Sequence, residues 1–248
     1  MTLLAVRGLT KRFGGLTATD NLDFGVDAGE LHAVIGPNGA GKTTLIAQLA
    51  GVLQPDAGTI LLDEENITTL SAHERVRRGL ARSYQVTNVF PRFSALDNVA
   101  LAVQARDGSS FRFWRPVAGE RHLAEAALAL LDRVGIRSRA AVLAGRLAHG
   151  EQRQLEVALA LATNPRLLLL DEPMAGMGDE SDRMVRLIES LKGRVTIVLV
   201  EHDMDAVFRL ADRVSVLVTG RVLATGAPAE IRANADVRRA YLGEESSV

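Results

Sequence analysis

Short apolar runs separated by glycine-containing turns open the chain. Four of them have the length and the flanking residues of β-strands: Leu3–Val6, Leu22–Val26, Leu31–Ile35 and Gly58–Leu62. Residues 42–51 follow the third run after a glycine-rich segment, and their pattern predicts a helix. The first part of the chain is therefore expected to be a set of strands with one helix among them.

The middle of the chain, from about residue 65 to residue 150, changes to helical periodicity and is rich in arginine. One predicted helix carries apolar residues along a single face and ends near Gly135: Leu123, Ala127, Leu130 and Val134. Residues 105–119 are rich in glycine, serine and arginine and contain the only tryptophan, Trp114. We expect them to form an exposed loop or a short insert.

After residue 150, predicted strands alternate with predicted helices. The helices are expected at about 151–162, 180–192 and 204–211, and the strands at Leu167–Leu170, Val195–Val200, Val214–Val218 and Val222–Ala224. A three-residue turn with a central Gly220 separates the last two strands, which predicts a hairpin. Alternation of strands and helices indicates a parallel sheet covered by helices, so the chain is predicted to have an α/β fold.

The composition limits what such a fold can do. The 248 residues are 47% hydrophobic but only 4% aromatic, which predicts an aliphatic core. A formal net charge of −1 gives no electrostatic basis for binding nucleic acid, and the absence of cysteine excludes disulfides and thiolate metal sites. No apolar run approaches the roughly 18 residues of a membrane span, and no signal peptide is expected at the N-terminus. Work at a membrane would therefore require docking on another protein.

The sequence GPNGAGKTT at residues 36–44 is the most informative motif. It fits the pattern G-x-x-x-x-G-K-[ST] between a predicted strand and a predicted helix, where unpaired backbone N–H groups can bind phosphate oxygens. Gly39 and Gly41 allow close approach of the backbone, Lys42 can reach the β- and γ-phosphates, and the Thr43 hydroxyl can bind Mg²⁺. The alternative, a glycine-rich turn without a ligand, satisfies all four fixed positions only by chance.

The run LLLLDEP at residues 167–173 predicts the second part of a phosphate site. Four leucines predict a strand buried on both faces, and Asp171 follows at its carboxyl end, where ligands of α/β sheets bind. Asp171 is suited to hold Mg²⁺ and Glu172 to polarise an attacking water, although the pair by itself is equally well explained as a cap before a proline turn. His202 ends another apolar strand and has either a contact with the γ-phosphate or a structural role.

These motifs, in this order, resemble the ATP-binding subunits of ABC transporters over nearly the whole chain. LAHGEQRQLEVALAL at residues 147–161 is similar to the segment usually written LSGGQ, which separates this family from other phosphate-loop proteins. The resemblance implies one ABC ATPase domain over residues 1–248. Its P-loop NTPase core, with a mostly parallel sheet and an N-terminal antiparallel β-subdomain, would span 1–84 and 163–248, and an inserted α-helical subdomain would span about 85–162.

The resemblance also implies roles for single residues. Phe13 matches the aromatic residue that stacks on adenine, Glu172 the catalytic base and His202 the switch histidine. The implied Mg²⁺ ligands are Thr43, Gln85 and Asp171, and the implied ATP contacts within the chain are Phe13, Gly36, Pro37, Asn38, Gly39, Ala40, Gly41, Lys42, Thr43 and Thr44. Members of this family hold two ATP molecules between two subunits, so contacts with ATP on the partner subunit are implied for Ala148, His149, Gly150 and Glu151.

The chain departs from the family pattern in the segment that faces the partner. Ala148 replaces the usual serine and removes one donor to the γ-phosphate, His149 replaces the first glycine, and Glu151 replaces the glutamine. We state as a hypothesis that His149 supplies the missing donor. Gly178, followed by Asp179, stands where the family often has aspartate. In the family this loop connects the two ATP sites, so the substitution bears on communication between them.

The implied partners are a second ATP-binding subunit, identical or different, and integral membrane permeases. Val86, Val89, Phe90 and Phe93 are candidates for the surface on which a permease helix docks. Several segments are similar to the branched-chain amino acid importers, including KRFGGLTA, LDEPMAGM, VEHDMD and the AYLG ending. This branch implies an extracytoplasmic solute-binding protein, a peripheral location on the cytoplasmic face of the inner membrane, and a bacterial source, and it generally pairs two different ATPases.

Other functions stay open at this point. The same ATPase could serve a transporter for urea, amides or another small solute, because this subunit does not touch the solute. A soluble ATP-driven clamp acting on nucleic acid usually carries a long coiled coil or two fused ATPase units, which 248 residues do not accommodate. A small-molecule phosphotransferase would leave LAHGEQ without a role.

Overall fold

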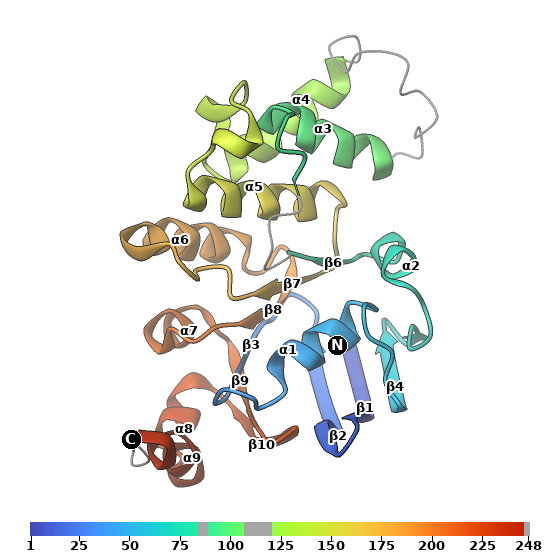
Figure 1. The fold of residues 1–248 in the computed structure, drawn as a ribbon, viewed down its shortest axis with the longest axis vertical. Coiled ribbons are helices and arrows are strands. Elements are labelled where there is room, and N and C mark those ends of the chain that lie inside the picture. Colours follow the sequence, from blue (N-terminus) through green and yellow to red (C-terminus); the bar gives the residue numbers. More distant parts are fainter. Residues whose placement is uncertain (84–88, 107–120, 246–248) are drawn as a thin grey trace.

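The computed structural model of the chain describes residues 1–83, 89–106 and 121–245 and contains two sheets with helices around them (Figure 1). One sheet is antiparallel, in the order β2-β1-β4-β5, with the bounds β1 (Thr2–Phe13), β2 (Leu16–Asp27), β4 (Ala57–Leu62) and β5 (Glu65–Asn66). The other has the order β10-β9-β3-β8-β7-β6, with the bounds β3 (Leu31–Ile35), β6 (Leu80–Arg82), β7 (Leu167–Asp171), β8 (Thr196–Val200), β9 (Arg213–Val218) and β10 (Arg221–Gly226). Its neighbouring strands are parallel except for β9 and β10.

The helices lie around the six-stranded sheet and at the two ends of the molecule (Figure 1). Their bounds are α1 (Lys42–Leu49), α2 (Ala72–Arg77), α3 (Ala95–Arg106), α4 (Arg121–Arg133), α5 (His149–Ala162), α6 (Ser181–Leu191), α7 (Met204–Leu210), α8 (Pro228–Ala233) and α9 (Ala235–Glu245), and the 3-10 turn η4 spans Gly178–Glu180. Helices α3 and α4 pack on each other and on α5 at one end, opposite to α8 and α9. Among the residues that the structure describes, no helix has the length and apolar character needed to cross a bilayer.

The core is built on both faces of the parallel sheet. Every residue of β3, β7 and β8 is buried, as expected for parallel strands covered on two sides. Leu168 and Leu170 belong to an apolar cluster with α3 to α7, whereas Leu167 and Leu169 belong to a second cluster with α1 and the antiparallel sheet. Helix α1 is therefore fixed between the two sheets, together with the loop that precedes it.

Several elements differ from the sequence-based expectation. The strands expected at Leu3–Val6 and Leu22–Val26 are parts of the much longer β1 and β2, whose register shifts disturb the apolar alternation. In α4 the buried residues are Leu123, Ala127 and Leu131, and the predicted Leu130 is only partly buried against the core. The β9–β10 hairpin is confirmed. Trp114 lies outside the described residues.

A fully buried arginine stabilises the far end of α1. Arg75 of α2 donates hydrogen bonds from Nη1 to the carbonyl oxygens of Gln48 (2.6 Å) and Leu49 (2.7 Å). Burial lowers the pKa of Arg75 to about 10, so the guanidinium is still charged at neutral pH. A cation at the carboxyl end of a helix meets the negative end of the helix dipole, and here it also satisfies carbonyl groups that have no partner within the helix.

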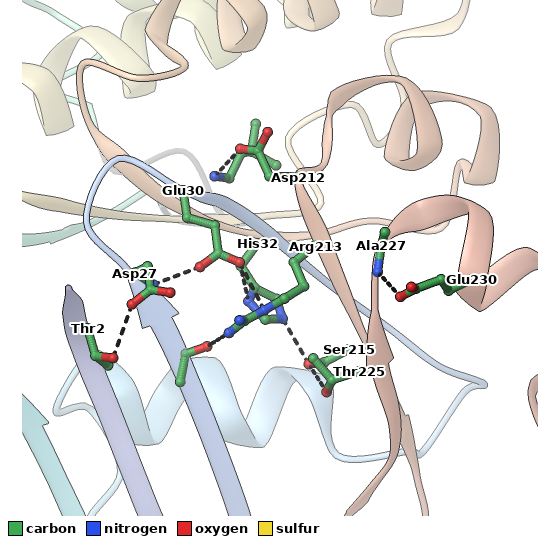
Figure 2. A network of polar contacts seen from close by, with 12 residues as sticks. Thr2, Asp27, Glu30, His32, Asp212, Arg213, Ser215, Thr225, Ala227 and Glu230 are labelled. Atoms are coloured by element: carbon green, nitrogen blue, oxygen red, sulfur yellow. Dashed lines mark hydrogen bonds and ion pairs between the residues drawn. The ribbon is translucent and has the colours of Figure 1, made fainter.

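A buried polar network joins β3, β9 and β10 on the face that packs against the antiparallel sheet, where the His32 ring contacts Phe24 of β2 (Figure 2). His32 of β3 lies between Glu30 Oε1, 3.1 Å from Nδ1, and Ser215 Oγ of β9, 2.8 Å from Nε2. The Ser215 hydroxyl contacts Thr225 Oγ1 of β10 at 2.7 Å, and Arg213 Nε lies 3.1 Å from Glu30 Oε1. The network therefore ties β3, which leads into the glycine-rich loop, to the β9–β10 hairpin.

Candidate functional site

Two close backbone approaches explain why the loop at residues 36–41 needs glycine. Gly36 has φ 154° and Gly41 has φ 103°, a region that favours glycine. A Cβ atom at Gly36 would collide with the carbonyl oxygen of Leu217 in β9, and one at Gly41 would collide with the carbonyl oxygen of Ala18 in β2. The loop is thus clamped between both sheets as it turns from β3 into α1.

The rest of the loop is also held by its own chain. Gly220 N, in the β9–β10 turn, donates a hydrogen bond of 2.9 Å to the carbonyl oxygen of Ala40. The buried Lys42 donates from Nζ to the carbonyl oxygens of Gly36 (2.5 Å) and Pro37 (2.9 Å). Gly39 has φ 76° and no atom within 4 Å of the place where a Cβ would lie, so this part of the loop is open to an incoming group. The loop is preformed, and its lysine reaches across it.

A cavity of about 350 Å³ opens beside this loop and brings together residues that the sequence places far apart. Its walls come from the β1–β2 hairpin, the loop with the start of α1, and the ends of β7 and β8; they are Phe13, Leu16, Ala18, Asn38, Gly39, Ala40, Gly41, Lys42, Thr43, Thr44, Glu172 and His202. The half-exposed ring of Phe13 stands at the tip of the hairpin. Except for Gly36 and Pro37, the predicted phosphate, base-stacking and hydrolytic residues of one chain therefore share one cavity.

Two adjacent acidic residues at the end of β7 have different surroundings. Asp171 is 1% exposed and receives a hydrogen bond of 2.8 Å from Arg82 Nη2 at the end of β6. Burial is the largest influence on Asp171 and raises its pKa, Arg82 opposes that rise, and the charge of Glu172 adds to it. Glu172 Oε1 instead lies 2.6 Å from His202 Nε2, at the edge of the cavity. The two carboxylates are therefore held for separate tasks.

The residues near the loop fit a magnesium ion. Asp171 Oδ1 is buried and has no hydrogen-bond partner among the described residues, and Thr43 contributes a hydroxyl to the cavity wall. Carboxylate and hydroxyl oxygens are the hard ligands that Mg²⁺ prefers, and this ion usually takes few protein ligands beside substrate phosphates. The described residues contain no group of three or more His, Asp or Glu side chains able to hold a metal by themselves.

The segment predicted to face the partner subunit lies at the start of α5 and is not part of the cavity wall. Ala148 has an N-cap backbone conformation but no side-chain acceptor for the free amides of the first turn. Glu151 accepts a hydrogen bond from Ala148 N (3.1 Å) and pairs with Arg139 Nε (2.7 Å). His149 Nε2 lies 3.3 Å from Ala175 O, and Gly150 is buried. A single described chain therefore does not bring these residues to its own phosphate loop.

Sequence reasoning missed Arg82, whose pairing with Asp171 depends on the parallel register of β6 and β7. A charged residue at the end of a three-residue strand gave no recognisable signal. Leu16 and Ala18 were also missed as cavity residues, although their place beside the hairpin of Phe13 was a usable hint. Gln85 and Val86, predicted as a metal ligand and a docking residue, lie outside the described residues.

The strand, glycine-rich loop and helix, together with acidic residues at the end of the neighbouring strand, define a phosphate-loop nucleotide-binding protein. The chain matches the ABC transporter family over residues 19–175 and the branched-chain amino acid ATP-binding cassette transporter family over residues 221–247. It belongs to the ABC transporter family, as its ATP-binding component. The family resemblance and the fold class predicted from the sequence are both confirmed.

Individual relatives agree with this assignment. The chain is 41% identical to the high-affinity branched-chain amino acid transport ATP-binding protein BraF of Pseudomonas aeruginosa, over 98% of both chains. It is 39% identical to the corresponding protein LivG of Escherichia coli, again over 98% of both chains. The crystal structure of the ADP conformation of an ATP-binding cassette from an ABC transporter superposes with a TM-score of 0.85 and 26% identity, covering 98% of this chain and 99% of that one.

Proposed function

We propose that this chain binds and hydrolyses ATP to power the uptake of branched-chain amino acids through permease subunits in the inner membrane, on whose cytoplasmic face it docks. One observation carries the mechanism: a single chain assembles the phosphate loop, Phe13, Glu172 and His202 around one cavity, while the start of α5 lies outside it. The site of one subunit would therefore be completed by another subunit.

Binding begins at the loop. The ring of Phe13 offers a face on which adenine can stack, at the tip of the β1–β2 hairpin. Lys42 exchanges its contacts with the carbonyl oxygens of Gly36 and Pro37 for contacts with the β- and γ-phosphates. The exchange is favourable because hydrogen bonds to charged phosphate oxygens are stronger than those to neutral carbonyl oxygens. Bound Mg²⁺, held through Thr43, Asp171 and Gln85, would neutralise charge on the phosphates.

Hydrolysis requires that a water be oriented toward the γ-phosphate. Glu172 is the candidate orienting base, because its carboxylate reaches the cavity while Asp171 is buried behind it. His202 holds Glu172 Oε1 at 2.6 Å and thereby fixes the direction of that carboxylate. The same ring can turn to the γ-phosphate when ATP is present, so the Glu172–His202 contact is expected to report the state of the nucleotide.

The substrate assignment is supported by the names and the extent of the similarity. BraF and LivG cover 98% of the chain, and the C-terminal match at residues 221–247 is to a family of branched-chain amino acid transporters. ATPases for urea, amides or other small solutes are the alternative. We also propose that the chain divides into a core at 1–84 and 163–248 and a helical subdomain at about 85–162. The transporter is further proposed to work with an extracytoplasmic solute-binding protein. No observation favours a nucleic-acid clamp.

Permease docking is proposed for the segment before α3. Phe90 and Phe93 are 60% and 44% exposed, and their rings lie 5.4 Å apart, whereas Val89 is partly buried against the core. The buried Asn98 of α3 accepts from Phe90 N and donates to the carbonyl oxygens of Phe90 and Phe93. The turn is therefore rigid, and it presents two aromatic rings to a partner rather than to the interior.

The test uses two variants of the cavity. Glu172→Gln should lower ATP hydrolysis by about 10²-fold or more while leaving ATP bound, because it removes only the base. Mixed with ATP, this variant should form a stable dimer, either with itself or with a second ATP-binding subunit encoded beside it, as measured by light scattering after size-exclusion chromatography. Lys42→Ala, which loses the phosphate contact, is the control that should not dimerise. If ATP produces no dimer with either partner, the composite site is wrong.

A further inference from the structure

His149 connects the start of α5 to the loop that follows Glu172, residues 173–180. Its Nε2 atom lies 3.3 Å from the carbonyl oxygen of Ala175 and 3.2 Å from the place where a Cβ of Gly176 would lie. A carbonyl oxygen only accepts hydrogen bonds, so Nε2 carries the proton and donates. The ring therefore rests on the bend of the loop, and this contact needs a side chain at a position where the family pattern has glycine.

The same turn of α5 contacts this loop at a second place. The backbone of Gly150 lies under the side chains of Met177 and Glu180, since a Cβ at Gly150 would come within 3.2 Å of Met177 Cε and would collide with the Glu180 carboxylate. Met177 is 7% exposed and belongs to the core. A carboxylate is favourable beside the positive end of a helix. Residues 149 and 150 thus form one continuous surface on which the loop packs.

The other end of the loop starts at Glu172 itself. Glu172 has φ 49°, an uncommon conformation for a residue with a side chain, and its N–H donates to Val200 O (2.8 Å). Ala175 N donates back to Glu172 O (3.1 Å), and Met174 N donates to the buried carboxylate of Glu201 (2.8 Å). A displacement of Ala175 would therefore be passed directly to the backbone of Glu172.

We propose that His149 is a positioning residue that latches residues 173–180 onto the first turn of α5. This inference rests on the proposed function, in which Glu172 acts on one ATP and the start of α5 faces the ATP of the partner. The latch makes these two parts of one subunit move together, so that contact with the partner's nucleotide sets the position of Glu172. His149 thereby takes a role inside its own subunit.

This role differs from the earlier hypothesis, in which His149 replaces the missing serine donor. In the structure the Nε2–H of His149 is directed at Ala175 O. It does not donate to the γ-phosphate of the partner's ATP while it is latched. The two roles make different predictions for the nucleotide-free protein, because only the latch is present without ATP.

Hydrogen–deuterium exchange of the nucleotide-free protein, followed by mass spectrometry, measures the latch directly. In His149→Ala the amides of Met174, Ala175, Met177 and Glu180 should exchange about fivefold faster, the effect of losing roughly one neutral hydrogen bond. His149→Gln, which keeps an N–H donor, should recover most of the protection. Alanine preserves the helical turn, and unchanged exchange at residues 155–162 of α5 is the control for folding.

Steady-state kinetics complete the test. In His149→Ala, kcat should fall several-fold with little change in KM for ATP, because the phosphate loop is untouched, and His149→Gln should restore it. Unchanged exchange at residues 174–180 in His149→Ala would overturn the latch. If His149→Ala also abolished ATP-driven dimers in the Glu172→Gln background while exchange stayed unchanged, His149 would act at the partner's nucleotide and not on its own loop. If the unmodified chain and its partner lack ATPase activity altogether, the proposed function fails, while the exchange result still decides the latch.

Discussion

Adjacent carboxylates with different surroundings determine what this site can do at the scale of single residues. Asp171 is buried and paired with Arg82, whereas Glu172 turns through a left-handed backbone conformation into the cavity and pairs with His202. The bend at Glu172 is what separates two neighbouring side chains by direction as well as by burial. Asp171 is thereby kept against the sheet, where we propose that it binds Mg²⁺, and Glu172 is kept at the cavity, where we propose that it orients a water.

Ala148 gives a prediction at this scale, because its backbone already has the geometry of an N-cap. Glu151 already accepts from Ala148 N, so Ala148→Ser would complete a capping box by accepting from the amide of Glu151. We expect a stabilisation of about 1 kcal/mol, or roughly 2–4 °C in melting temperature for a chain of this size. Differential scanning calorimetry measures it.

The added hydroxyl should also donate to the γ-phosphate held by the partner, so hydrolysis by the assembled ATPase should rise. Ala148→Val changes the size of the side chain without adding an acceptor or donor, and it is the matched control. If Ala148→Ser has the same melting temperature as the unmodified protein, the backbone amides of the first turn of α5 already have hydrogen-bond partners. A higher melting temperature with unchanged hydrolysis would separate the cap from the phosphate contact.

At the scale of elements, prediction from sequence worked where burial is uniform. Every residue of β3, β7 and β8 is buried and nearly all are apolar. The phosphate loop follows β3 and the Asp171–Glu172 pair stands at the end of β7, so the site could be predicted from them. The short β6 and α2 have too few residues to show a period, and the Arg82–Asp171 pair is created only by the register between β6 and β7. The contact of His149 with Ala175 likewise depends on tertiary packing that no sequence pattern encodes.

The network between β3, β9 and β10 gives a pH prediction. Burial raises the pKa of Glu30, but hydrogen bonds from His32 and Asp27 N and the charge of Arg213 outweigh it and hold that pKa below its ordinary value. A lowered carboxyl pKa stabilises the fold at pH values above the unfolded-state pKa, and this contribution is lost as pH falls through the folded-state pKa. Glu30→Gln should therefore lose less free energy of unfolding than the unmodified protein as pH falls from above the ordinary carboxyl pKa of 4.5 through the lower pKa of the folded state.

Urea denaturation at several pH values measures this difference, with Glu189→Gln as the control. Glu189 is an exposed carboxylate that pairs with Arg209 on the surface, and such pairs contribute little. Its replacement should leave the pH dependence of the unmodified protein almost intact. If Glu30→Gln and Glu189→Gln show the same dependence, the buried network does not couple folding to the charge of Glu30.

At the scale of the whole molecule, the two working surfaces are separated. The cavity lies where the two sheets meet, and the helices α3, α4 and α5 form the end opposite to α8 and α9 (Figure 1). Helix α5 belongs to both parts, since it packs on α3 and α4 and also on β6 and α6. Its first turn carries His149, so a shift of the helical end relative to the sheet would be felt at the loop after Glu172. If the permease docks at this end as proposed, docking and catalysis are connected through α5.

Phe90→Asp tests the docking end of that connection. The substitution places a charge on an exposed aromatic patch without opening a hole in the core, so the melting temperature should stay within about 2 °C of the unmodified value. Co-purification with the permease subunits should be lost, since a buried unpaired charge at an interface costs several kcal/mol. ATP-driven dimerisation in the Glu172→Gln background should survive, because Phe90 does not line the cavity.

The matched control is Leu223→Asp, which introduces the same charge at a 43% exposed apolar residue of β10, at the other end of the molecule. It should leave the complex with the permeases intact, because nothing in the fold relates β10 to the turn held by Asn98. Loss of the complex in both variants would mean that added surface charge disrupts it wherever the charge is placed. If Phe90→Asp leaves the complex intact, the docking surface does not include Phe90. The proposed connection from the permease through α5 to Glu172 would then be contradicted.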